Sequence, residues 1–133
     1  MEAKVIKSGN PLVNQIMISL EDRKAQDIVC LDLRGNEDAT VDYMIVCHGD
    51  STTQVNAIAG NLEKEVSEKL NTKPSRIEGE RNAVWVLVDY FDVVVHIFHH
   101  EMRAFYRLED LWSDALSPNA PKEKRIAKKI NTK

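Results

Sequence analysis

Residues 47–51 read Cys-His-Gly-Asp-Ser and form the first segment whose residue types could bind a ligand. An apolar, β-rich run precedes the segment, and an apolar pattern at helical spacing follows Ser51. A helix N-terminus carries free amides and a partial positive charge, which suit an anion. Ser51 and Gln54 also match a capping box, in which their side chains satisfy the first amides. We expect a plain capped strand-to-helix turn, with a phosphate site as the less favoured alternative.

The same turn resembles the strand–Gly–Ser–helix start of nucleotidyltransferases. Those enzymes need two or three carboxylates that converge on magnesium. Glu63 and Glu65 are the nearest downstream acidic pair, but two residues of helix rotate by about 200°, so these side chains point to opposite sides and cannot share a metal. A metal-dependent nucleotidyltransferase would have to use Asp89 and Asp92 from a later hairpin. This enzyme is our alternative hypothesis.

Histidines cluster near residue 100, where His96, His99 and His100 are followed by Glu101. His96 alternates with valines in a strand-like run, which is typical of a hydrogen-bonded core or interface residue. A zinc site would need three or four converging ligands, and no cysteine is near. We therefore expect neither a bound metal nor a cofactor.

The two cysteines, Cys30 and Cys47, each lie inside an apolar run. This placement predicts buried thiols that act as small hydrophobes, on adjacent strands but without a functional disulfide. The chain also lacks a nucleophile-elbow motif, a Walker motif and a dinucleotide-binding fingerprint. We do not expect an enzyme.

The strongest strand signals come from residues 84–89 and 92–98, joined by Tyr90 and Phe91 as a two-residue link. Alternation places Trp85, Leu87 and Asp89 on one face, and Val86, Val88 and Tyr90 on the other. Asp89 and Asp92 flank the aromatic turn. Aromatic side chains beside carboxylates are typical of an anchor for a basic protein partner. Packing of Trp85 beneath a helix is an equally supported alternative.

Eight elements must position these residues, in the order helix, strand, strand, helix, three strands, helix. Their expected ranges are 11–24, 27–33, 43–47, 51–70, 75–78, 84–89, 92–98 and 99–112. Adjacent strands together with a crossover helix predict an α/β fold, in which helices pack on a mixed central sheet.

The chain has 133 residues, 43% of them apolar and 29% charged, as expected for one globular domain. We place this domain at residues 11–116, followed by a basic tail at 117–133. Residues 1–116 carry 12 Lys/Arg and 20 Asp/Glu, whereas the tail carries 6 Lys/Arg and Glu123 alone. The acidic body suits a basic protein partner, and the tail could contact RNA weakly or simply be solvated. Without a signal peptide or a long apolar run, we expect a cytoplasmic protein that does not enter membranes.

Several blocks together resemble the ribosomal silencing factor (Iojap-related) family. They lie at residues 25–33, at 42–47 with Gly49 and Ser51, at 85–96, and at 105–112 with Glu109 and Trp112. The resemblance runs in unbroken order over residues 12–112.

This resemblance implies a nucleotidyltransferase-like α/β fold without catalytic carboxylates. It also implies binding to the large ribosomal subunit through its ribosomal protein fourteen, which blocks joining of the small subunit and represses translation. The partner contacts implied for this chain are Trp85, Asp89, Tyr90 and Asp92. A homodimeric interaction module without a ribosomal role is a third hypothesis.

Two residues depart from the family pattern. His48 stands where Ser or Thr is usual, which further disfavours an anion site at this turn. Phe91 stands where Gly is usual, so the hairpin turn must either be strained or adopt another turn type.

Overall fold

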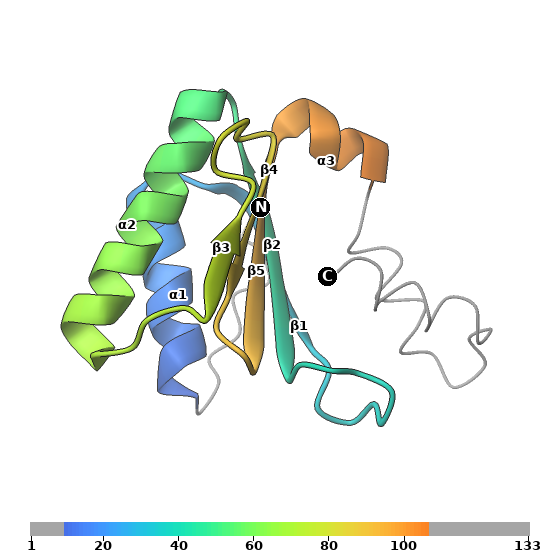
Figure 1. Cartoon of the computed structure of the whole chain (residues 1–133). Coiled ribbons are helices and arrows are strands. Elements are labelled where there is room, and N and C mark those ends of the chain that lie inside the picture. Colours follow the sequence, from blue (N-terminus) through green and yellow to red (C-terminus); the bar gives the residue numbers. More distant parts are fainter. Residues whose placement is uncertain (1–9, 107–133) are drawn as a thin grey trace.

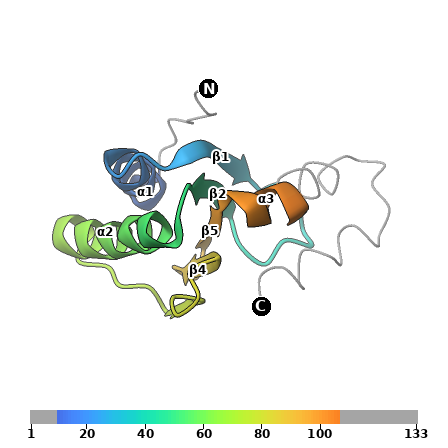
Figure 2. The ribbon, with the colours of Figure 1, turned by 90° about the horizontal axis from the view of Figure 1, so that it is seen from above.

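The computed structural model describes residues 10–106, which form a five-stranded sheet with helices on both faces (Figure 1). Seen from above, α1 and α2 lie together on one face and α3 lies on the other (Figure 2). The elements are α1 (Pro11–Asp22), β1 (Gln26–Asp32), β2 (Tyr43–Gly49), α2 (Thr52–Leu70), β3 (Arg76–Glu78), β4 (Trp85–Asp89), β5 (Val93–His99) and α3 (His100–Tyr106). This order and the α/β class confirm the prediction.

The strands follow the spatial order β1-β2-β5-β4-β3. Only the central pair, β2 and β5, is parallel, and the three other pairs are antiparallel. Central strands of a mixed sheet are covered on both faces, and residues 93–98 of β5 are all buried accordingly. The predicted mixed sheet is therefore confirmed.

Both long helices begin at side-chain caps that the sequence provides. The Asn10 carboxamide oxygen accepts from the amides of Leu12 at 2.9 Å and Val13 at 3.2 Å, and Pro11 occupies the first turn. Ser51 caps α2, which ends at Asn71 in the left-handed conformation (φ 54°). Each helix then buries one apolar stripe against the sheet.

The core has two parts, one on each face of the sheet. The larger part joins α1 and α2 to the sheet and includes Cys30, Cys47 and Tyr90. The smaller part comprises Leu33, Val41, Met44, Val46, Leu87, Val94 and Phe98, with Trp85 and Met102 packed against it. The alternation predicted for residues 85–90 is confirmed, because Trp85 and Leu87 pack on this second face while Val86, Val88 and Tyr90 face α1 and α2.

The structure revises the predicted link between β4 and β5 and shows the start of the last predicted helix. Three residues, 90–92, separate β4 from β5, so the predicted two-residue link was one residue too short. The last predicted helix is present as α3, whereas Glu109, Trp112 and the predicted tail at 117–133 lie outside the described residues. None of the helices in residues 10–106 is long and apolar enough to span a membrane.

Candidate functional site

The four residues predicted to contact a partner lie along β4 and the turn that follows it. Trp85 and Asp89 mark the two ends of this strand and face the same side. The four residue steps from Trp85 to Asp89 span about 14 Å in an antiparallel strand. The candidate site is therefore an elongated strip and not a compact cluster.

Trp85 is half-buried on the sheet face opposite α1 and α2, where it packs against the second part of the core. Its ring lies 4.9 Å from the ring of Phe98, between centroids. Its indole N–H donates a 3.0 Å hydrogen bond to Nδ1 of His96 on β5. Trp85 thus packs against the second part of the core and remains partly exposed.

His96 is a core residue, as predicted, with no solvent exposure. Burial lowers the pKa of its imidazole to about 3, so the ring is neutral at physiological pH. Nδ1 accepts from Trp85, which places the proton on Nε2. Nε2 has no hydrogen-bond partner among the described residues.

The turn between β4 and β5 is built around Phe91. The amide of Tyr90 donates to the carbonyl of Val93 at 2.8 Å, and the amide of Asp92 donates to the carbonyl of Tyr90 at 3.0 Å. With Phe91 at φ 80°, this second bond closes a γ-turn of the rare positive-φ form. Both outcomes expected for Phe91 are therefore observed, because the link adopts another turn type and Phe91 has a positive φ within it.

The two aspartates of the turn have different roles. Asp89 is tied into the protein, because Oδ1 accepts from the amide of Phe91 at 2.8 Å and Oδ2 lies 3.3 Å from Nε of Arg76. Asp92 is exposed, and its carboxylate has no hydrogen bond to any described residue. Its carbonyl accepts from the amide of Asp42 at 2.8 Å, which fixes the turn to the start of β2. Asp92 is therefore the freer of the two charges.

Tyr90 points away from this strip, toward α2. Its side chain is only 6% exposed, and its hydroxyl has no hydrogen-bond partner among the described residues. Burial, followed by the nearby charge of Glu63, raises the pKa of the phenol above its usual value. The predicted rim is corrected here, because Tyr90 packs beneath the turn and is not on its surface.

The Gly49–Ser51 turn is the capped helix start that the sequence predicts. The Ser51 hydroxyl accepts from the amide of Gln54 at 3.0 Å, and the Gln54 side chain accepts from the amide of Asp50 at 2.7 Å. A Cβ on Gly49 would lie 3.3 Å from side-chain atoms of Gln54 and Ile58. The glycine thus allows close helix–strand packing, and the protein itself occupies two of the amides that an anion would need.

The carboxylates required by the nucleotidyltransferase hypothesis do not meet this turn. Gly49 pairs with His99 at one end of the parallel pair, whereas Asp92 precedes Val93 at the other end. Six strand steps separate the ends by about 20 Å. Glu63 and Glu65 also diverge as predicted, since Glu65 accepts from Ser19 of α1 at 2.7 Å while Glu63 faces β3. Residues 10–106 contain no group of three potential metal ligands.

A contact between α3 and the first two strands is not predictable from local sequence patterns. Arg103 donates to the carbonyl of Asp27 at 2.7 Å and to Nδ1 of His48 at 3.0 Å. Asp27 has φ 48° and lies in an irregular stretch of β1, which turns its carbonyl out of the strand ladder. Burial and then the Arg103 charge lower the pKa of His48. Arg103 is thus a structural partner of His48, the residue that stands where the family pattern usually has Ser or Thr.

The remaining histidines and both cysteines also have structural surroundings. The rings of His99 and His100 stack at 4.6 Å, and His99 Nδ1 accepts from the amide of Glu101 at 3.2 Å. Cys30 and Cys47 are buried and unpaired on adjacent strands, as predicted. Burial raises the pKa of Cys30 to about 11 and that of Cys47 to about 12, so neither is a ready nucleophile.

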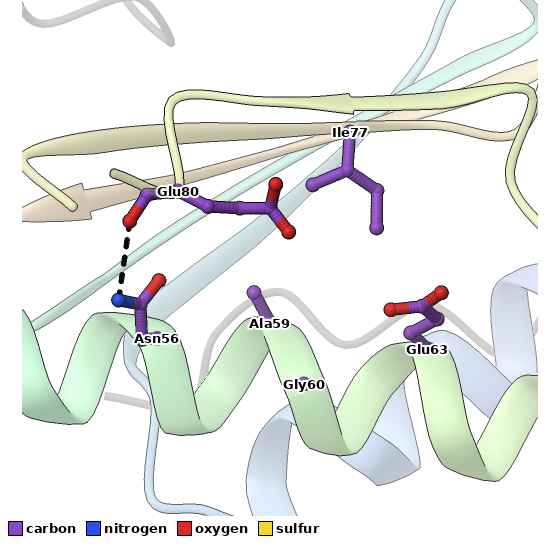
Figure 3. Close-up of a pocket in the computed structure, with 6 residues that line it drawn as sticks. All are labelled: Asn56, Ala59, Gly60, Glu63, Ile77 and Glu80. Atoms are coloured by element: carbon purple, nitrogen blue, oxygen red, sulfur yellow. Dashed lines mark hydrogen bonds between the residues drawn. The ribbon is translucent and has the colours of Figure 1, made fainter. Parts of the chain in front are cut away.

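Two shallow hollows lie away from β4. One, of about 290 Å³, separates α2 from β3 and is lined by Asn56, Ala59, Gly60, Glu63, Ile77 and Glu80 (Figure 3). In it the Asn56 amide donates to the carbonyl of Glu80 at 3.2 Å, bridging α2 to the segment after β3. The other, of about 490 Å³, is lined by Asn10, Pro11, Arg34, Asp42 and Tyr43. Neither hollow brings a nucleophile, a general base and ligand-binding groups together.

Comparison with known proteins identifies the family to which the chain is similar. Residues 6–133 match the family model described as "Ribosomal silencing factor during starvation". A ribosomal silencing factor from Halalkalibacterium halodurans is 42% identical over 108 residues, covering 81% of this chain and 91% of the relative. A crystal structure of a Chromobacterium violaceum protein superposes with a TM-score of 0.72 at 35% identity, covering 77% of this chain and 83% of that one.

A more distant relative is the mouse "Mitochondrial assembly of ribosomal large subunit protein 1". It is 30% identical over 103 residues, which cover 76% of this chain and 45% of the mouse protein. The family match spans nearly the whole sequence, and the solved structure shares the fold that the strands and helices build here. The chain belongs to the ribosomal silencing factor family.

Proposed function

We propose that this chain acts in the cytoplasm by binding the large ribosomal subunit through its ribosomal protein fourteen. Bound there, it sterically blocks joining of the small subunit and represses translation. The observation that carries the proposal is the match to the silencing-factor family over residues 6–133. The name of the mouse relative refers to assembly of the ribosomal large subunit, and this supports the large subunit as the binding partner.

The proposed contact is the β4 surface, which we define as Trp85, Asp89 and Asp92. Trp85 supplies a half-buried aromatic ring on the face of the sheet opposite α1 and α2, and Asp92 supplies an exposed carboxylate at the turn. A partly exposed Trp is a frequent hot spot because it buries a large area at little entropic cost. In this proposal Tyr90 supports the turn from beneath and does not touch the partner.

Charge favours a basic protein over nucleic acid as the direct partner of this surface. Residues 1–116 carry 20 acidic against 12 basic side chains, so their field attracts cations and repels phosphate. Asp92 has no intramolecular cation among the described residues, and it can pair with Lys or Arg of the partner. The basic residues of 117–133 then add at most a weak contact with ribosomal RNA.

Cosedimentation of the full chain with purified large and small subunits tests this function. We expect binding to large subunits alone, weakened several-fold by Asp92→Asn because one partner charge loses its counterpart. Glu68→Gln removes an equal charge from the exposed side of α2 and should bind as wild type does. Binding to small subunits, or to neither subunit, would contradict the proposed function. If Asp92→Asn and Glu68→Gln weaken binding equally, the β4 surface is not the contact.

A further inference from the structure

Phe91 combines two features that both disfavour folding. Its backbone has φ 80°, a region that bulky L-residues rarely adopt because the side chain crowds the backbone. Its side chain is 76% exposed and belongs to neither part of the hydrophobic core. Backbone strain of this kind persists where the surrounding structure enforces it, and such strained positions cluster at functional sites.

The surrounding structure does enforce this conformation. Asp89 Oδ1 accepts from the amide of Phe91 at 2.8 Å, and the bond between Asp92 N and Tyr90 O closes the turn on the other side. The buried ring of Tyr90 and the bond from Asp42 N to Asp92 O fix both flanks. The Phe91 ring is thus held on a rigid tip and needs little ordering when it meets a partner.

The charges around the tip are acidic. Asp42 and Asp92 are exposed, and Asp89 is half-buried beside them. Arg76 offsets Asp89 through the 3.3 Å contact. Arg34 lies close enough to Asp42 to act on it electrostatically, which leaves Asp92 as the uncompensated charge next to Phe91. An exposed aromatic ring next to such a carboxylate fits an apolar pocket whose rim is basic, which is the composition expected on a ribosomal protein and not on RNA or on a second acidic copy of this chain.

We propose that Phe91 is the central anchor of the partner interface, inserting into an apolar pocket with a basic rim on the large-subunit protein. This inference rests on the proposed function and extends the β4 surface to the tip of the turn. It also explains why a residue that weakens the fold occupies the most prominent position of the hairpin.

The test compares Phe91→Gly with wild type in two measurements on the full chain. Glycine adopts φ 80° without strain, so thermal unfolding should move to a higher temperature. Affinity for purified large subunits should fall by about 30-fold, the loss expected when an interface hot spot is removed. Ile18→Ala is the matched control, since Ile18 is also an exposed apolar residue (52%) but lies on α1. It should change the affinity by less than about twofold.

The outcomes separate the two proposals. If wild-type chain fails to bind large subunits, the proposed function falls and the anchor with it. If wild type binds and Phe91→Gly binds equally well, only the anchor is wrong. A lower unfolding temperature for Phe91→Gly would also overturn it, because Phe91 would then stabilise the fold itself.

Discussion

The indole N–H of Trp85 donates a 3.0 Å hydrogen bond to Nδ1 of His96, joining β4 to β5 on the face of the sheet opposite α1 and α2. This bond satisfies the only acceptor of a fully buried neutral imidazole. It also fixes the orientation of a ring that we propose as a partner contact. Trp85 therefore has a structural role in addition to the recognition role that we propose, and experiments must separate the two.

Trp85→Phe separates them. Phenylalanine keeps an aromatic ring against Phe98 but cannot donate to His96, which leaves a buried acceptor unsatisfied. We expect the free energy of unfolding to fall by about 1–3 kcal/mol, measured by urea denaturation. Trp85→Ala also loses the ring packing and should fall further. Equal stability of wild type and Trp85→Phe would show that the hydrogen bond has no energetic role.

His96 makes stability depend on pH. Its folded pKa of about 3 lies below the usual histidine pKa of 6.5, so between these values the unfolded chain binds a proton that the folded chain does not. Stability therefore falls as the pH decreases below about 6.5, by about 2 kcal/mol between pH 7 and pH 5. Urea denaturation at the two pH values measures this loss.

His96→Gln is the control for that measurement. Glutamine can still accept from Trp85 but does not titrate. The His96→Gln protein should therefore lack the loss of about 2 kcal/mol in stability that His96 causes between pH 7 and pH 5. The lowered pKa of His48 acts in the same direction in both proteins and cancels in the comparison. Identical pH profiles would show that His96 is not the source.

Gly60 and Gly79 should respond oppositely to alanine. Gly60 lies within α2, and a Cβ there would meet no atom within 4 Å, so Gly60→Ala should stabilise the protein by about 1 kcal/mol. Gly79 has φ 89°, and a Cβ would collide with the carbonyl oxygen of Trp85. Gly79→Ala should destabilise it by more than 1 kcal/mol. Thermal unfolding of the two variants checks both signs, and a stabilised Gly79→Ala would contradict the described backbone of this segment.

Ser51→Ala tests the role of the Gly49–Ser51 turn. Loss of the cap on α2 should cost about 1 kcal/mol of stability. Binding to large subunits should stay unchanged, because α2 packs on the face of the sheet opposite Trp85 and the turn lies at the far end of the sheet from Asp92. Loss of subunit binding in a folded Ser51→Ala protein would show that the turn has a direct functional role.

Local patterns predicted most of the fold. Helical spacing, the capping box at Ser51 and the alternation in residues 85–90 all depend on neighbours in sequence, and each is confirmed. Two features could not be predicted in this way. The loop at Tyr90 depends on the pairing of Asp89 with Val94 and on the long-range bond between Asp42 and Asp92. The contact of Arg103 with Asp27 and His48 joins residues more than fifty positions apart.

The candidate site was predictable only in part for the same reason. Alternation correctly placed Trp85 and Asp89 on one face and Tyr90 on the other. It could not show that Tyr90 is buried against α2, or that Asp89 is engaged by the amide of Phe91 and by Arg76. These contacts depend on which elements cover each face, and the strand pattern alone does not contain that information.

A subunit-joining assay measures whether the chain keeps the two ribosomal subunits apart. Large subunits are saturated with the chain and then mixed with small subunits, and light scattering follows the formation of whole ribosomes. We predict that the formation of whole ribosomes falls in proportion to the fraction of large subunits occupied by the chain. The Glu68→Gln variant should inhibit joining as wild type does. Full joining at a chain concentration that saturates the large subunits would contradict the proposed function.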